Sequence, residues 1–510
     1  LRLQGARQRG VAGAVQQEQP QGFAHGISVA QQGPQTQGCV LYHRDGESER
    51  WVDDERAGAA SLHSSLAEGS RGGLPGGAHR GKVAAMRIGI GTSDFRELRT
   101  ERVAYIDKSL LVRELLNNGA KVVLLPRPRR FGKTTNLSML RAFFERGSDD
   151  DKAARWALFA DLAIARCPEA EEVRAHFGRY PVIALSFKDV KTTRWKTCFA
   201  ALREVLAETF QGHRDLLQDS RVADEDQALL RRVLGRKARP SELWPALRLL
   251  TRLLHQVHGQ PVLVLLDEYD TPLHSAYLHG YYDEAVEFLR NLLSAGLKDN
   301  PHLYKGVLTG VLRVARDSIF TGLNHLAVYG ILQPEFSAHF GFSEDEVRSL
   351  LPPGPEGEAQ LAVVRDWYNG YLFGGRVVYN PWSVLSFVKS AQKEPQPYWI
   401  MTGGTDLIRE LLIDQGLGLS ADLETLIAGG AIERELVDQF ALREARDRSD
   451  LVWSLLLHTG YLKPQRLWLQ ENANSASLEQ LDEVRSSLDA ARTRIEGQLQ
   501  QIERARGSLA

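Results

Sequence analysis

A glycine, a lysine and two threonines stand in a row at Gly132, Lys133, Thr134 and Thr135. A lysine ammonium can contact the outer phosphates of a nucleotide, and a threonine hydroxyl can ligate Mg²⁺. An apolar run at 122–125 precedes these residues, and an amphipathic helical pattern follows them. Strand, tight loop and helix in this order are typical of a phosphate-binding P-loop, in which backbone N–H groups and the positive end of the helix face the phosphates.

The loop departs from the usual glycine-rich pattern. In G-x-x-x-x-G-K-[ST] the first glycine falls on position 127, where this chain has Arg127, and Pro126 and Pro128 remove amide donors. The alternative to a nucleotide-binding loop is a basic, solvated loop before an ordinary helix. The residues predicted to contact the nucleotide are Arg127, Arg129, Arg130, Phe131, Gly132, Lys133, Thr134 and Thr135.

An acidic pair forms the second half of the pattern. The apolar run at 262–266 leads directly into Asp267 and Glu268. An acidic residue at the end of a buried strand beside a P-loop holds Mg²⁺, and a following glutamate can orient or deprotonate the attacking water. The combination predicts ATP as the ligand and Mg²⁺ as the cofactor, with Thr134 and Asp267 on the metal and Lys133 and Glu268 catalytic.

Three further residues are candidates for the same site. Thr309 lies within the predicted strand at 302–312 and is predicted to sense the terminal phosphate from a strand between the two motif strands. Arg313 follows and could neutralise charge in phosphoryl transfer, although arginines in such places are more often structural. Asp107 is a candidate for the wall of the base pocket, with plain helix capping as the alternative.

The elements that must position these residues alternate along the chain. Buried strands are predicted at 122–125, 181–187, 262–266 and 302–312, and helical patterns occur at 194–211, 224–235, 241–258 and 282–297. Such alternation predicts an α/β P-loop NTPase fold with a mostly parallel sheet flanked by helices. We assign it to residues 86–334.

A mainly helical accessory domain is predicted at 335–463. Ser343 and Glu346 form a capping box, Gly374-Gly375 marks a tight hairpin, and Asn380 caps a further helix. Aromatic side chains in this region could offer a base-stacking platform, but few basic residues accompany them, so core packing is the preferred interpretation. These aromatics are Trp367, Tyr368, Tyr371, Phe373, Tyr379 and Trp382.

Composition restricts the remaining choices. A chain of 510 residues has room for two or three domains, and a formal net charge of −1 gives no basic footprint for nucleic acid. No apolar run reaches the roughly 18 residues needed to cross a bilayer. The three scattered cysteines match no metal-binding pattern and favour a reducing cytoplasm.

Residues 1–85 are rich in Gln, Gly, Ser and Ala, and the first methionine is Met86. This composition has little periodicity and predicts a disordered or non-native extension. We expect the working protein to start at or near Met86, with a genuine disordered tail as the alternative.

The chain resembles the bacterial AAA-ATPase-like proteins, which often carry a PD-(D/E)XK nuclease-like domain at the C-terminus. The resemblance spans roughly 87–463 and rests on the segments 91–109, 124–140, 265–273, 308–326, 340–347, 367–387, 398–404 and 455–462. It implies that Lys133 and Thr134 contact the phosphates and Mg²⁺ and that Asp267 and Glu268 form the acidic pair. Arg127 in place of the first glycine is usual in this family.

The tail at 464–510 differs from the family. It contains no Asp followed by a Glu-x-Lys triad, so we expect no nuclease activity. Leucine or isoleucine recurs every seven residues, which predicts an amphipathic, coiled-coil-like helix over 478–509 that could pair with a partner or a second copy. These residues are Leu481, Leu488, Ile495, Ile502 and Leu509.

Together these features predict a P-loop ATPase that hydrolyses MgATP to drive or gate a partner, without nucleic acid or membrane contacts. One alternative is a nucleotide-dependent binding or assembly module with negligible turnover. Another is a truncated remnant that lacks its nuclease-like effector domain.

Overall fold

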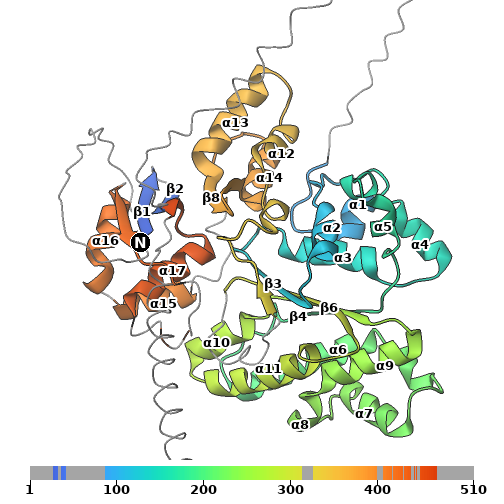
Figure 1. Ribbon diagram of the computed structural model, residues 1–510. Coiled ribbons are helices and arrows are strands. Elements are labelled where there is room, and N and C mark those ends of the chain that lie inside the picture. The colour runs from blue at the N-terminus through green and yellow to red at the C-terminus, as the bar shows by residue number, and fades with distance from the viewer. Residues whose placement is uncertain are drawn as a thin grey trace, which may run out of the picture. The chain divides into compact units, whose positions relative to one another are not determined.

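The computed structural model describes residues 27–32, 36–41, 87–312 and 326–398, and most of 406–467 (Figure 1). The chain divides into two units, Leu1–His25 with Trp468–Ala510, and Gly26–Leu467. The first unit lies outside the described residues, as do the predicted helix at 478–509 and most of the predicted disordered extension.

Five parallel strands form the central sheet, in the order β4-β5-β6-β3-β7. Their bounds are β3 Val122–Pro126, β4 Val182–Ser186, β5 Val262–Asp267, β6 Leu303–Gly310 and β7 Leu326–Val328. The predicted fold class is confirmed, and β6 lies between the two motif strands as expected. The sequence pattern did not predict β7, which is short and pairs with the outer side of β3.

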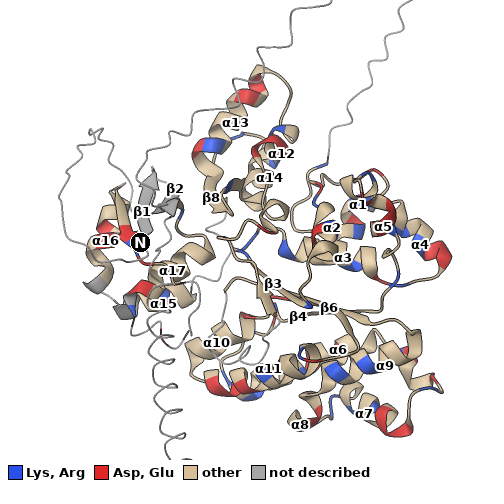
Figure 2. Ribbon diagram, in the orientation of Figure 1, with Lys and Arg blue, Asp and Glu red and all other residues tan. Residues whose placement is uncertain are grey.

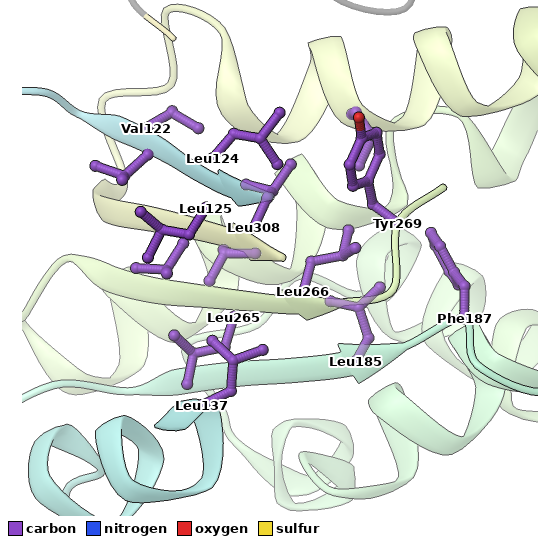
Figure 3. Packing of buried hydrophobic residues seen from close by; sticks show 14 of the residues in the cluster. Val122, Leu124, Leu125, Leu137, Leu185, Phe187, Leu265, Leu266, Tyr269 and Leu308 are labelled. Carbon is purple, nitrogen blue, oxygen red and sulfur yellow. The ribbon is translucent and has the colours of Figure 1, made fainter. Parts of the chain in front are cut away.

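The sheet is buried because helices cover both of its faces. Strands β3 and β5 are buried at every position, which matches their unbroken apolar sequences. Figure 3 shows Leu124, Leu265 and Leu308 from three neighbouring strands packed in this core, together with Leu137 from α3. In Figure 1, α2 and α3 lie on one side of the sheet, and α6, α9 and α11 lie on the other.

The helices around the sheet agree with the predicted segments. Their bounds are α1 Phe95–Thr100, α2 Leu110–Asn117, α3 Lys133–Phe144, α4 Asp149–Trp156, α5 Ala170–Arg174, α6 Trp195–Gln211, α7 Asp224–Leu234, α8 Pro240–Leu243, α9 Ala246–His258, α10 Thr271–His279 and α11 Tyr282–Leu297. Helix α10 was not predicted. It follows the acidic pair almost directly and carries Pro272 in its first turn, where a missing N–H costs no intrahelical bond.

The chain after β7 forms a second, mainly helical part. Its elements are α12 Glu344–Ser349, α13 Pro355–Tyr368, β8 Asn369–Phe373, β9 Arg376–Tyr379, α14 Pro381–Lys389, α15 Asp406–Gln415, α16 Leu417–Ile427, β10 Ala431–Arg434, α17 Ser449–Thr459 and β11 Pro464–Leu467. The Ser343 capping box, the hairpin and the Asn380 cap are confirmed. Residues 342–387 also have a hydrophobic cluster of their own.

A second sheet was not expected from the sequence. Strands β10 and β11 pair antiparallel with β1 (Ile27–Gln32), which also pairs with β2 (Thr36–Leu41). These two N-terminal strands are the described portion of the stretch predicted to be disordered or non-native. Among the described helices, none combines the length and apolar character required to span a membrane.

Candidate nucleotide site

The loop between β3 and α3 is shaped by a glycine at the start of the helix. Gly132 is the N-cap of α3 and has φ 81°, a left-handed conformation that side chains disfavour. This turn reverses the chain so that α3 begins at Lys133. The first N–H groups of a helix have no intrahelical partners, so they face outward as donors for an anion.

Lys133 is buried beneath this loop. Its Nζ donates to the carbonyl oxygens of Arg127 and Pro128, each at 3.0 Å. Burial lowers the pKa of Lys133, while the charges of Glu268 and Asp267 oppose that shift. The amine is therefore held between the loop and the acidic pair, where a bound phosphate would supply the anionic partner that its desolvated charge favours.

Asp267 joins three elements at the carboxyl edge of the sheet. Its Oδ2 accepts a hydrogen bond from Thr134 Oγ1 at 2.6 Å, and its Oδ1 accepts one from Thr309 Oγ1 at 2.6 Å. Helix α3, strand β5 and strand β6 thus each contribute one oxygen-bearing side chain. The two threonines satisfy both carboxylate oxygens and fix their orientation.

This donor set fits Mg²⁺. The Thr134 hydroxyl and the Asp267 carboxylate are hard oxygen ligands at a common point, and Mg²⁺ in nucleotide sites takes one or two protein oxygens together with water and phosphate oxygens. The described residues contain no group of three or more His, Cys, Asp or Glu side chains able to hold a metal on their own. A magnesium ion here would therefore be held jointly by the protein and the phosphates.

Glu268 leaves the strand on a strained turn. Its φ is 50°, a left-handed conformation that costs a non-glycine residue on the order of 1 kcal/mol. The Glu268 carboxylate accepts a hydrogen bond from Thr271 Oγ1 at 3.2 Å, which supports its position from the start of α10. The left-handed conformation of Glu268 turns the chain away from the direction of β5.

A pocket of about 390 Å³ opens over this constellation. Of the residues predicted from the sequence, seven line it: Arg129, Arg130, Gly132, Lys133, Thr134, Thr135 and Glu268. Asp267 and Thr309 are buried: Asp267 accepts a hydrogen bond from Thr134, and Thr309 lies behind Asp267. Arg313 and Arg316 lie outside the described residues.

Comparison with known proteins finds a family model that matches this region. Residues 89–320 match the family described as AAA-ATPase_like, Predicted AAA-ATPase. This region is therefore similar to the AAA-ATPase-like family. The match contains the loop, the acidic pair and Thr309, and it supports nucleotide binding at the level of the family.

One curated relative has no assigned activity. An uncharacterized protein in the vnfD 5' region of Azotobacter chroococcum mcd 1 is 28% identical over 352 residues, which cover 69% of this chain and 60% of that protein. The chain thus matches about three fifths of the length of this relative. No solved structure matches the chain significantly.

Arg127 lies apart from the pocket, although the sequence suggested a nucleotide contact. The side chain is fully buried, and its Nη1 donates to the carbonyl oxygens of Pro126 at 2.8 Å and Tyr329 at 2.6 Å. Its guanidinium lies 4.9 Å from the ring centre of Phe340 and 5.4 Å from that of Phe373. Burial lowers the pKa of Arg127 to about 9, so it remains charged at neutral pH.

Phe131 and Asp107 also lie outside the pocket lining. The Phe131 ring packs against Tyr371 and Phe373 of the hairpin, with ring centres 4.7 and 5.0 Å apart. Asp107 accepts hydrogen bonds from the backbone N–H groups of Ser109 at 2.8 Å and Ala163 at 2.6 Å. Asp107 thus fixes local backbone, but the N-cap of α2 is Ser109, so the predicted capping of that helix by Asp107 is wrong, and Phe131 has a packing role.

The pocket also contains residues outside the predicted site, among them Trp382, for which the sequence analysis preferred core packing over base stacking. They are Gly89 to Ser93 before α1, Lys188, Asp189 and Lys191 after β4, and Pro381, Trp382 and Leu385 on α14. The Arg130 guanidinium stacks over the Trp382 ring at 4.2 Å. The cap at Asn380 and the proline at 381 were a sequence signal for the start of α14, but nothing local related that helix to the loop.

The last two residues of the Asp267–Asp270 motif hold the end of β6. Asp270 Oδ2 accepts from the N–H groups of Val311 and Leu312, both at 2.9 Å, and Tyr269 Oη donates to the Leu312 carbonyl at 2.7 Å. Gly310 is needed here because a Cβ would lie 2.6 Å from Asp270 Oδ1. The motif therefore fixes the chain just before Arg313.

The placement of Arg127 gives a testable prediction. Arg127→Met keeps the side-chain volume and removes a buried charge, so the Kd for ATP should stay within about threefold of wild type. Arg127→Ala leaves a cavity between Phe340 and Phe373 and should lower the Tm by about 5–10 °C. Calorimetry and thermal unfolding measure the two effects. A large loss of ATP affinity in folded Arg127→Met would place Arg127 on the nucleotide.

Proposed function

We propose that this protein binds MgATP in the pocket and hydrolyses it to ADP and phosphate. The observation that carries the proposal is the Asp267 carboxylate held by Thr134 and Thr309, with Lys133 and Glu268 beside it. This arrangement combines a phosphate-binding amine, oxygen ligands for Mg²⁺ and a separate carboxylate for water. The family match at 89–320 supports the same assignment.

Each of these residues has a separate role in phosphoryl transfer. Lys133 and the N–H groups at the start of α3 hold the outer phosphates, while Thr134 and Asp267 would hold Mg²⁺, which would offset phosphate charge. Glu268 accepts a proton from water as the water oxygen bonds to the terminal phosphorus and the bond to the bridging oxygen breaks. The bridging oxygen leaves with ADP, and the proton passes from Glu268 to the released phosphate.

The apolar side of the pocket suits the base. Ile90, Pro381, Trp382 and Leu385 supply its apolar lining, whereas the basic residues come from the loop and from the end of β4. An aromatic ring beside a base typically contributes about 1–3 kcal/mol through stacking. We therefore assign the adenine to the wall formed by Trp382 and its neighbours.

Trp382→Ala is expected to raise the Kd for ATP about tenfold, because it removes the ring that stacks on the base and on Arg130. Trp382→Phe keeps an aromatic face and should bind ATP within about threefold of wild type. Equilibrium titration with a fluorescent ATP analogue measures both. Equal affinity of the alanine variant and wild type would remove the base from this wall.

The decisive test of the function is phosphate release by the full-length protein. Purified chain is mixed with ATP and Mg²⁺, and parallel samples contain excess EDTA or no ATP. Mg²⁺-dependent release of phosphate supports the ATPase. ATP binding without release favours a nucleotide-controlled assembly module, and absence of both contradicts a nucleotide site.

The partner is proposed from charge and from the tail. Acidic and basic side chains both occur on the described helices around the sheet (Figure 2), and the formal net charge of the chain is −1. We therefore propose a protein partner or a second copy, joined through the heptad pattern at 478–509, in preference to nucleic acid. ATP turnover would drive or gate that association.

A further inference from the structure

The end of β4 lies beside the acidic pair. Strands β4 and β5 are parallel and in register, with Ser186 opposite Asp267. One residue later, the Phe187 N–H donates to the Asp267 carbonyl at 3.0 Å. The segment that follows, residues 187–192, therefore leaves the sheet next to Asp267 and Glu268.

This segment is anchored at three points. Phe187 and Val190 are buried in the core. The Thr192 N–H donates to Ser275 Oγ at 2.9 Å, and the Thr192 carbonyl accepts from Tyr281 Oη at 2.6 Å. Ser275 belongs to α10, which begins directly after the acidic pair. The loop is thus fixed to the same structural unit that presents Glu268.

Two lysines project from the anchored segment. Lys188 and Lys191 flank the buried Val190 and have exposed side chains, and both line the pocket together with Glu268 and Lys133. Within the described part of the chain, neither lysine forms an ion pair with a carboxylate. Exposed lysines are usually only solvated, but these two are mounted on a fixed loop inside a pocket suited to phosphates.

Phosphoryl transfer needs positive charge near the transferred group. The terminal phosphate and the leaving oxygen carry the charge of the transition state, and many ATPases take the neutralising cation from an arginine, sometimes of a neighbouring subunit. The position of Lys188 and Lys191 beside Glu268 places such cations in the same chain. Their side chains are long and can reach over the pocket from a rigid base.

We propose that Lys188 and Lys191 stabilise the transferred phosphate in the transition state, as an internal substitute for an arginine from another subunit. This role rests on the proposed ATPase activity. The lysines donate hydrogen bonds and exchange no proton. The proton of the attacking water still passes to Glu268, and the electron pair of the broken bond stays on the ADP oxygen.

The test compares lysine variants of the full-length protein. Lys188→Met, Lys191→Met and the double variant are assayed for phosphate release in a single turnover at saturating MgATP, and for ATP affinity. Lys196→Met is the matched control, because Lys196 is an exposed lysine of α6 outside the pocket lining. The corresponding Lys→Arg variants test whether the charge itself restores the rate.

We expect the double methionine variant to lose at least about 100-fold in rate, with the Kd for ATP within about threefold of wild type. The arginine variants and Lys196→Met should remain within about threefold in rate. The rate per protein molecule should also stay constant as protein concentration rises, because the cations act within one chain.

Three results would overturn the inference. The first is a full rate in the folded double variant. The second is an equal loss of rate and ATP affinity, which would mean that the lysines hold the ground state. The third is a rate per molecule that rises with protein concentration in wild type and the double variant alike. If wild type itself releases no phosphate, the proposed ATPase function fails together with this role.

Discussion

Replacing Lys133 with alanine is expected to raise the Kd for ATP at least about 100-fold. The Lys133 amine is the buried cation nearest the start of α3, and it lies between the loop and the acidic pair. Its loss removes a charge-assisted contact to phosphate inside a desolvated site, where such contacts are strongest. Isothermal titration calorimetry with MgATP measures the change directly.

The control must separate lost binding from a loosened loop, because Lys133 Nζ also bonds the carbonyls of Arg127 and Pro128. Lys133→Gln keeps a donor for those carbonyls and removes the charge. Both variants should unfold thermally near the wild-type temperature, and both should fail to bind ATP. Wild-type affinity in either folded variant would refute the phosphate-binding role of Lys133.

Glu268→Gln is expected to lower the rate of phosphate release about 10²- to 10³-fold while the Kd for ATP changes by less than about threefold. Glutamine has the same shape and can still accept the hydrogen bond from Thr271, so the strained turn is preserved. It cannot accept the proton of the attacking water. Single-turnover phosphate release and calorimetry distinguish the two quantities.

Glu287→Gln is the matched control for this variant. Glu287 is an exposed carboxylate on α11 outside the pocket lining, so its neutralisation should leave both rate and affinity unchanged. If Glu268→Gln turned over like wild type, water would have to be activated by another group. If wild type bound ATP without releasing phosphate, the protein would act as a nucleotide-controlled module.

The strands and helices that carry the candidate site could be predicted from the local sequence. The apolar runs before Gly132 and Asp267 predicted buried strands, and the intervening helical patterns predicted a mostly parallel sheet flanked by helices. Residue types then indicated the chemistry, because Lys133, Thr134, Asp267 and Glu268 follow their strands at the spacing that phosphates and Mg²⁺ demand. Local backbone preferences and short-range hydrogen bonds decide such features.

Tertiary structure decided which side chains face the pocket. Arg127 and Phe131 belong to the same loop as Lys133. Arg127 packs against Phe340, and Phe131 packs against Tyr371 and Phe373. All three rings belong to a part of the chain that is distant in sequence from the loop. The direction in which a loop side chain points depends on which residues pack against the loop. No local pattern contains that information.

Sequence motifs likewise did not predict the other residues that line the pocket. Lys188 reaches the site because β4 pairs in register with β5, and Trp382 reaches it because α14 lies against the loop through Arg130. Strand order and helix packing depend on which apolar faces bury one another across hundreds of residues. The sequence by itself therefore determined the residues proposed to bind phosphate and the strands that carry them, and only the folded chain decided what surrounds them.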